Sequence, residues 1–340
     1  MNGFPTNASY VRKGFNYQDM AALYYFLMHI SEIAELNNEG NEDIDVKLKD
    51  GTIRYFQAKE TKNIDNALKK TELRDALHTL SNNIIRQNYN HLDEVGIITN
   101  CNYPFTQKDY NFKVPYKKID YSGLSSIATK RINDILQEFP KEIDIDFLLS
   151  KLSVTKLAYQ GSDDASLLER LEIPIYSFMT MARIERSRYR QLLMDWSFLF
   201  NRSSENIKYK ITPQKFIERT AVTIMDEPNL DKFFSIFQIR TGNKTYISNN
   251  YSEQLEKFLN NFKYMSVIQQ DFDKYTNKNQ NMLQNDLEIE FVNYEYEKIS
   301  KLMGLNEEEA DQDIVKLIIW LRIIHDTYFR NLESIISDED

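Results

Sequence analysis

Two neighbouring segments of this 340-residue sequence carry polar side chains at alternate positions. Asp43 and Asp45 share one face of the first segment, and Gln57 and Lys59 share one face of the second. Carboxylate and amide oxygens are the hard ligands that Mg²⁺ or Mn²⁺ prefers, and a nearby Lys can orient a water or help to deprotonate it. If the two faces coincide, these side chains are suited to metal-assisted hydrolysis of a phosphodiester, with Asp43, Asp45 and Gln57 holding the metal.

The elements that must position these residues form a β-hairpin. Residues 43–48 alternate between polar and apolar side chains, which predicts a strand. Asp50-Gly51 predicts the turn, and residues 53–60 predict the returning strand. Because successive side chains of a strand point to opposite faces, Glu42 and Glu60 are expected on the faces away from this set, as ordinary surface acids.

Helices and a further strand complete the predicted α/β core. Residues 17–35 have the pattern of a buried helix, and a second helix follows the hairpin with apolar residues at helical spacing, namely Leu73, Leu77, Leu80 and Ile84. The short apolar run 95–99 predicts a central strand covered on both faces. Beyond about residue 124 the helical period dominates, with a long helix over 175–200. The predicted fold is an α/β domain with a mixed sheet flanked by helices, residues 1–210, followed by an all-α domain, residues 211–340.

The hairpin also resembles a known family. Asp43 or Asp45 followed by Gln57-Ala58-Lys59 resembles the PD-(D/E)xK nuclease motif in its Gln-x-Lys variant, and Gly14–Asp19 leads into an apolar helix as in that family. Over residues 12–105 the sequence is similar to the double-stranded DNA endonuclease domain of bacterial anti-phage effectors. These are the CD-NTase-associated nucleases of CBASS, the effector nuclease of Lamassu systems, and nucleases paired with HerA-type ATPases.

The resemblance implies a restriction-endonuclease-like domain that uses Mg²⁺ or Mn²⁺ to cut double-stranded DNA in defence against phage. Asp43, Asp45, Gln57 and Lys59 would be its catalytic residues, supported by Gln18 from the first helix. The choice between Asp43 and Asp45 as the main metal ligand stays open. Because Gln57 is neutral where the family motif is acidic, the rival interpretation is an inactive nuclease-like scaffold or adaptor of a defence complex. An RNA or single-strand nuclease is a further alternative, and a plain solvated hairpin face with cross-strand Asp–Lys pairs is the simplest one.

Charge limits how the chain could bind DNA. With 42 Lys and Arg against 51 Asp and Glu, the formal charge is −9, so contact with DNA requires a local basic patch. The strongest candidate contains Arg183, Arg186, Arg188 and Arg190; weaker ones are Lys69 and Lys70, near Arg74, and Tyr116-Lys117-Lys118. Pairing of the arginines with neighbouring acids on a solvated helix face is an equal alternative.

The remaining expectations concern partners and location. The apolar stretch 314–324 is too short and too charged for a membrane span, so we expect it to close the core of the helical domain. No nucleotide-binding glycine motif is present, so a partner such as an SMC-like or HerA-type ATPase would supply any ATP hydrolysis. The single cysteine and the absence of a signal-like leader predict a cytoplasmic protein. We expect a regulatory protein partner that restrains the nuclease, and a homo-oligomer in the active state.

Overall fold

The computed structural model describes residues 17–86, 91–108, 110–140, 142–158, 164–206, 208–226, 228–259, 263–304 and 308–337. Residues 14–16 of the quoted helix entry lie outside these ranges. The chain divides into two compact units, the first formed by Met1–Phe178 with Trp196–Pro213 and the second by Met179–Asp195 with Gln214–Asp340. Each unit is described below by itself.

A six-stranded mixed sheet forms the centre of the first unit, in the order β1-β2-β3-β4-β6-β5. The strands are β1 (Ile33–Asn38), β2 (Ile44–Leu48), β3 (Ile53–Lys59), β4 (Leu92–Thr99), β5 (Tyr116–Asp120) and β6 (Leu152–Leu157). β3, β4 and β6 run parallel, whereas β1, β2 and β5 each pair antiparallel to a neighbour. The carboxyl ends of the three parallel strands therefore lie on the same edge of the sheet as the start of β2 and the start of β5.

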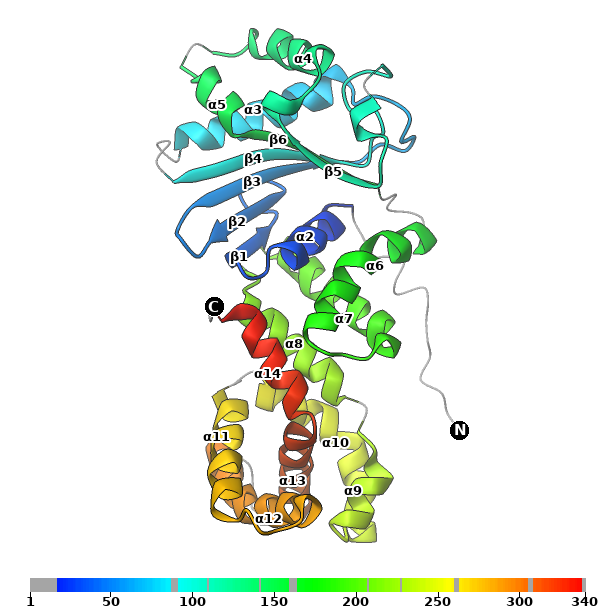
Figure 1. Ribbon diagram of the computed structural model, residues 1–340, viewed down its shortest axis with the longest axis vertical. Helices are drawn as coiled ribbons and strands as arrows, with labels where there is room; N and C mark the ends of the chain where they lie inside the picture. The colour runs from blue at the N-terminus through cyan, green and yellow to red at the C-terminus, as the bar shows by residue number, and fades with distance from the viewer. Residues whose placement is uncertain are drawn as a thin grey trace. The chain divides into compact units, whose positions relative to one another are not determined.

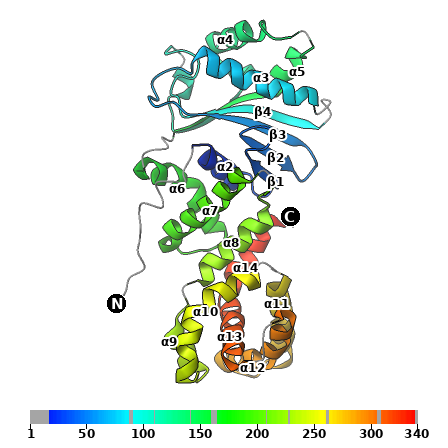
Figure 2. The same ribbon diagram turned by 180° about the vertical axis from the view of Figure 1, so that it is seen from behind.

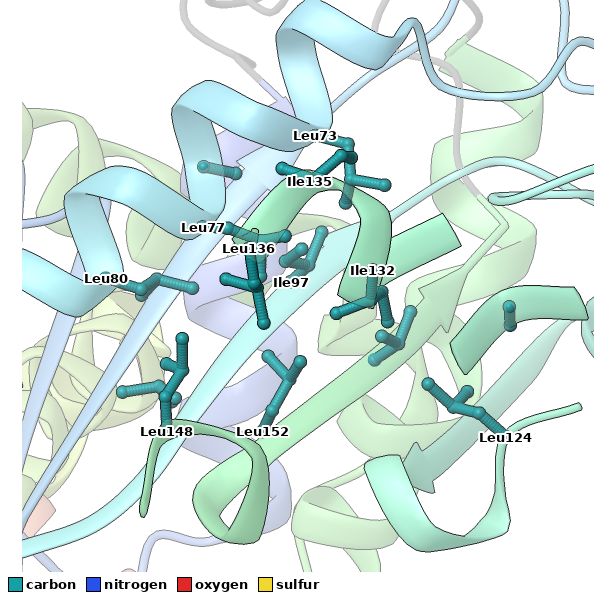
Figure 3. Packing of buried hydrophobic residues seen from close by; sticks show 14 of the residues in the cluster. Leu73, Leu77, Leu80, Ile97, Leu124, Ile132, Ile135, Leu136, Leu148 and Leu152 are labelled. Carbon is teal, nitrogen blue, oxygen red and sulfur yellow. The ribbon is translucent and has the colours of Figure 1, made fainter. Parts of the chain in front are cut away.

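Helices cover both faces of the sheet. α3 (Lys70–Arg86), α4 (Ser126–Leu136) and α5 (Ile145–Lys151) lie on one face, and α2 (Tyr17–Met28) lies on the other (Figures 1 and 2). Leu73, Leu77 and Leu80 of α3 point toward the sheet and pack with residues of α4, α5, β4 and β6 (Figure 3). Each fully buried Leu contributes about 1.5–3 kcal/mol relative to an exposed one, so this layer fixes α3 against β3 and β4.

The predicted hairpin, the helix after it and the strand over 95–99 are confirmed. At the turn between β2 and β3, Gly51 has φ +88°, and the Thr52 amide donates to the Asp50 carboxylate at 2.8 Å. A positive φ costs glycine little, which explains the Asp-Gly pair at this point. Short 3₁₀ turns, Tyr110–Phe112 and Tyr121–Gly123, flank β5.

Three strands differ from the sequence predictions. The helix expected over 17–35 ends at Met28, and residues 33–38 form β1 instead. β5 and β6 lie in the stretch expected to be loop and helix. All three are short and obtain their hydrogen bonds from residues distant in sequence or across a turn, so local periodicity carries little signal for them.

The helix expected over 175–200 is two helices, α6 (Asp164–Met181) and α7 (Tyr189–Glu205), with a 3₁₀ turn at Arg186–Arg188 between them. Arg183 has φ +56°, its amide donates to the Thr180 carbonyl at 3.1 Å, and the Ile184 amide donates to the Met179 carbonyl at 2.7 Å. This hydrogen-bond pattern is a Schellman motif, which ends a helix through one left-handed residue.

The second unit is helical, as expected. Its helices after α7 are α8 (Pro213–Met225), α9 (Leu230–Ile236), α10 (Thr241–Leu259), α11 (Lys263–Lys278), α12 (Gln284–Met303), α13 (Glu309–Ile324) and α14 (Asp326–Ile336). Ile314, Leu317 and Ile318 of α13 are buried among α10, α11 and α12, so the prediction that this stretch closes the helical core is confirmed. In the described part of the chain, no helix combines the length and the apolar character that a membrane span requires.

Candidate active site

The candidate site lies at the sheet edge where β2 begins and β3 ends. Ile44 pairs with Phe56, and Asp45 pairs with Tyr55 across the two antiparallel strands. Directly opposed residues share a face, so Asp43, Gln57 and Lys59 project on the face that α3 covers. Asp43, Gln57 and Lys59 therefore come together as the sequence predicted, whereas the Asp45 carboxylate does not join them.

Asp43 is at the centre of this cluster. Its Oδ2 atom accepts a hydrogen bond from the Ala58 amide at 2.7 Å and lies 3.4 Å from the Lys59 Nζ atom. Its Oδ1 atom lies 3.3 Å from the Gln57 Nε2 atom. Both charged groups are about three-quarters buried, with 22% of the Asp43 side chain and 25% of the Lys59 side chain exposed. The carboxylate is therefore fixed by the strand opposite and is still reachable from solvent.

Gln18 supports the backbone rather than a carboxylate. Its Nε2 atom donates to the Asp43 carbonyl oxygen at 2.8 Å, and the Glu39 amide donates to the same carbonyl at 3.0 Å. Gln18 is buried on α2, on the opposite face of the sheet from α3. It fixes the point where the chain enters β2, which in turn sets the position of the Asp43 side chain.

Glu42 also belongs to the cluster, and the expectation that it is a surface acid is wrong. Its side chain is buried, with the residue 3% exposed, and its carboxylate accepts hydrogen bonds from the Gln57 side-chain amide and from the side-chain amide of Asn83 on α3. Residue 42 precedes β2 in a turn where Glu39 has φ +61°, so strand alternation does not govern its direction. Glu60 is exposed, as expected.

Asn83 carried a signal in the sequence. It lies three residues after Leu80 and one before Ile84, inside the apolar stripe of α3, and it is 2% exposed. A polar residue in such a stripe needs a buried hydrogen-bonding partner, and here the partner is Glu42.

Asp45 shares the face with Asp43, yet its carboxylate turns toward the preceding loop. It accepts hydrogen bonds from the Asn41 amide at 2.7 Å and the Glu42 amide at 2.9 Å. A Cβ atom on Gly40 would lie 2.2 Å from the Asp45 Oδ2 atom, so glycine is required for this close approach. Asp45 thus stabilises the turn that carries Glu42.

The pKa of the Glu42 carboxyl is raised to about 8, chiefly by burial and also by the charges of Asp43 and Asp45, against the opposing effects of the Gln57 hydrogen bond and the Lys59 charge. Burial also raises the pKa of Asp45 to about 6, against the two amide hydrogen bonds. In the metal-free protein both carboxyls therefore hold a proton up to a higher pH than ordinary acids do.

Glu42, Asp43 and Gln57 together offer two carboxylates and one amide oxygen of the kind that a hard divalent cation takes. Within the described residues, no group of three or more His, Cys, Asp and Glu side chains is arranged to hold a metal ion. A cation at this site would therefore complete its shell with the Gln57 amide, water or a phosphate oxygen.

The structure places the candidate basic residues in three different settings. Lys69 and Lys70 are ion-paired, with Glu72 at 3.4 Å and Glu138 at 2.6 Å. Arg183 occupies the left-handed position that ends α6. The remaining three lie, like Arg183, in the second unit: Arg186 and Arg188 in the 3₁₀ turn, and Arg190 at the start of α7. Their contact with DNA stays a prediction.

Comparison with known proteins points to a class of enzyme that cuts DNA. Residues 9–172 match the family model described as the Cap4 dsDNA endonuclease domain. The matched region contains the whole sheet and every residue of the Glu42–Asp43 cluster. This region of the chain is therefore similar to a domain that cuts double-stranded DNA.

Two solved structures are similar to the chain. One is the Cap4 SAVED/CARF-domain containing receptor of Moraxella osloensis, with 17% identity, a TM-score of 0.38, and coverage of 63% of this chain and 48% of that one. The other is the Cap4 SAVED/CARF-domain containing receptor of Acinetobacter baumannii, with 17% identity, a TM-score of 0.38, and coverage of 63% and 47%. The chain thus spans about half the length of the structures that it matches. No curated protein matches it.

Proposed function

We propose that this protein is a metal-dependent endonuclease that hydrolyses double-stranded DNA as the effector of an anti-phage defence system. The observation that carries the proposal is the position of the Asp43 carboxylate between the Ala58 amide and the Lys59 ammonium at the end of β3. The match of residues 9–172 to a DNA endonuclease domain supports it independently. Double-stranded DNA is the preferred substrate over RNA or a single strand because the matched family model describes a dsDNA endonuclease domain.

The donor chemistry of the site fits Mg²⁺ or Mn²⁺. Glu42 and Asp43 are adjacent carboxylates with the single ammonium of Lys59 beside them, and burial raises the pKa of Glu42 to about 8. A divalent charge between the two carboxylates would balance them and favour their ionised forms. Such a cation supplies Lewis-acid polarisation of the phosphodiester.

Each residue of the cluster would then have its own role in metal binding or hydrolysis. Asp43 and Glu42 hold the cation, with Asp43 rather than Asp45 as the main ligand, because the Asp45 carboxylate is bound to two backbone amides. Lys59 orients the attacking water and offsets the charge that develops on the phosphate. Gln57 Nε2 now faces both carboxylates, so its oxygen could join as a ligand only after the amide rotates.

Glu42 can replace the carboxylate that the site lacks because residue 57 is a neutral glutamine. A Gln-x-Lys motif lacks one carboxylate of the acidic motif, which on its own favours an inactive scaffold. In this chain Glu42 brings a carboxylate to the same spot through a hydrogen bond with the Gln57 amide. The site therefore has as many carboxylates as the acidic form of the motif, although one of them comes from residue 42 instead of residue 57. This count favours an active enzyme of the PD-(D/E)xK type with a restriction-endonuclease-like core.

The helical unit would be the regulatory part. It shows no second catalytic motif, and a DNA-cutting enzyme requires restraint in the cell that makes it. We assign it to contact with a regulatory partner, such as an ATPase of the SMC or HerA type, and to self-association in the active state. Both assignments are derived from the resemblance noted in the sequence.

The test is cleavage of linear and circular double-stranded DNA with Mg²⁺ or Mn²⁺ at high protein concentration, with RNA and single-stranded DNA in parallel. The wild-type chain should cut both duplex forms and should lose activity in EDTA. Lys59→Ala and Asp43→Asn should each lower the rate by about 100-fold or more, the usual effect of removing one group that stabilises transition-state charge.

Lys47→Ala is the matched control. Lys47 is an exposed lysine on β2, at the opposite end of the strand from Asp43, so this variant should cut DNA like the wild type. Equal cleavage by wild type and Lys59→Ala would refute the site. Binding of Mn²⁺ without any cleavage, alone or with the partner complex, would favour the scaffold.

A further inference from the structure

The lysine of the candidate site belongs to a row of residues that crosses four strands. Lys59 of β3 pairs with Thr99 of β4, Thr99 pairs with Lys156 of β6, and Lys156 pairs with Lys117 of β5. Residues in register on neighbouring strands share a face, so the three lysines lie on the side of the sheet that α3 covers. Strands are about 4.8 Å apart, which puts the Lys117 backbone roughly 14 Å from that of Lys59.

The loop between β4 and β5 continues this edge. Lys108 and Lys113 are exposed on it, and Lys117 is exposed at the start of β5. In the described part of the chain, none of these three takes part in an ion pair with a carboxylate. Lys69, Lys70 and Lys118 differ, because each of them is paired with a glutamate. We call Lys108, Tyr110, Lys113 and Lys117 the edge surface.

Local charge makes the edge surface unlike the rest of the chain. Residues 103–118 contain four lysines and one acid, Asp109, whereas the whole sequence has a formal charge of −9. An exposed basic segment in an acidic protein attracts polyanions through a local field.

An aromatic side chain stands among these lysines. Tyr110 is 68% exposed, and its ring packs edge-on against Tyr103 with centroids 5.9 Å apart. A tyrosine held in this way can donate its hydroxyl to a phosphate oxygen, which is a common backbone contact in protein–DNA complexes.

The loop that carries the edge surface is anchored. Phe105 and Phe112 are buried in the core of the unit, and the Asn102 amide donates to the Ile64 carbonyl at 2.6 Å, which ties the loop after β4 to the loop after β3. The side-chain oxygen of Asn102 also accepts a hydrogen bond from Lys156. These contacts hold the backbone of the loop to the same unit that carries Lys59.

The geometry points to the edge surface as a second contact with the DNA duplex, on the backbone that lies across the major groove from the phosphate at Lys59. The roughly 14 Å between the two positions is close to the width of that groove, about 12 Å. The inference rests on the proposed function for its substrate. It adds that the contacts with the duplex backbone come from β5 and the loop before it, and not from the ion-paired Lys69 and Lys70 at the start of α3.

The test measures binding of the full chain to a 30-base-pair duplex in EDTA, so that cleavage does not interfere, over a series of salt concentrations. Lys113→Gln combined with Lys117→Gln should weaken binding to unrelated sequences alike. It should lower the slope of log affinity against log salt by about 2, since each lost phosphate contact removes about 1. Tyr110→Phe should weaken binding at a fixed salt concentration and leave the slope as it is.

The matched control is Lys47→Gln combined with Lys130→Gln, which removes two exposed lysines of the same unit that are not part of the edge surface. It should reproduce the wild-type slope, and all variants should unfold at the wild-type temperature. Equal slopes for the edge-surface variant and the control would overturn the inference while wild-type cleavage in Mg²⁺ left the nuclease intact. A wild-type chain that neither binds the duplex nor cuts it would instead refute the proposed function, and the inference with it.

Discussion

Glu42 and Gln57, fifteen residues apart, are joined by a hydrogen bond from the Gln57 side-chain amide to the Glu42 carboxylate. The same amide lies 3.3 Å from Asp43, so one neutral side chain separates two acids. A glutamate at position 57 would place a third negative charge at this point. The neutral amide of Gln57 instead donates a hydrogen bond to the buried Glu42 carboxyl, so the two positions form one hydrogen-bonded pair.

Replacing Glu42 tests this pairing. Glu42→Gln keeps the shape of the side chain and removes the charge, so we expect Mn²⁺ affinity to fall by at least about 10- to 100-fold, the loss seen even for residues that only support a ligand. Calorimetric titration with Mn²⁺ measures it. Unchanged Mn²⁺ affinity would place the second ligand elsewhere.

Asp43 and Asp45 should separate into a ligand and a structural residue. Asp45→Ala removes the acceptor for two backbone amides, so we expect the free energy of unfolding to drop by about 1–3 kcal/mol. The fold-loss of Mn²⁺ affinity in Asp45→Ala should be at most a tenth of the fold-loss in Asp43→Ala. Urea denaturation and metal titration of both variants decide the matter. A larger loss of affinity in Asp45→Ala would reverse the assignment.

Asp19 makes stability depend on pH. It is buried on α2, where it accepts a hydrogen bond from Asn38, and burial raises its pKa to about 6 from the ordinary 3.8. The folded state therefore binds a proton more tightly than the unfolded state between pH 4 and 6. This contribution is complete below about pH 4 and is lost as pH rises through 6, with a total of roughly 3 kcal/mol.

Asp19→Asn should remove that dependence. The difference in unfolding free energy between variant and wild type should grow in favour of the variant from pH 4 to pH 7, as measured by urea denaturation at several pH values. Asp146→Asn, at an exposed position of α5, is the control and should show no such trend. Parallel curves for Asp19→Asn and wild type would mean that Asp19 ionises normally.

The sequence predicted the part of the site that depends on local pattern. The Asp-Gly turn sets the register of β2 against β3, and once the register is known, Asp43, Gln57 and Lys59 must share a face. The sequence also predicted α3, from apolar residues at the 3.6-residue spacing of a helix, and β4, from a short continuous apolar run.

The rest of the site depends on backbone turns and distant contacts. Glu42 reaches the cluster because the chain reverses at Glu39, and Asp45 leaves it because its carboxylate binds that same reversal. No residue pattern encodes the direction of a side chain in an irregular turn. β1 and β6 were missed for a related reason, since their hydrogen bonds come from strands that local periodicity cannot anticipate.

The two margins of the sheet are protected from other chains in different ways. β1 has its outer side occupied by Ile211, which exchanges backbone hydrogen bonds with Leu36 at 2.7 and 2.8 Å. Among the described residues no strand lies beyond β5 in the sheet order, and the exposed side chains of β5 include Lys117 and Lys118. Lysines on an edge strand oppose its pairing with a strand of another chain. The lysines of β5 would therefore also oppose aggregation of this protein through the outer side of β5, whether or not DNA is bound there.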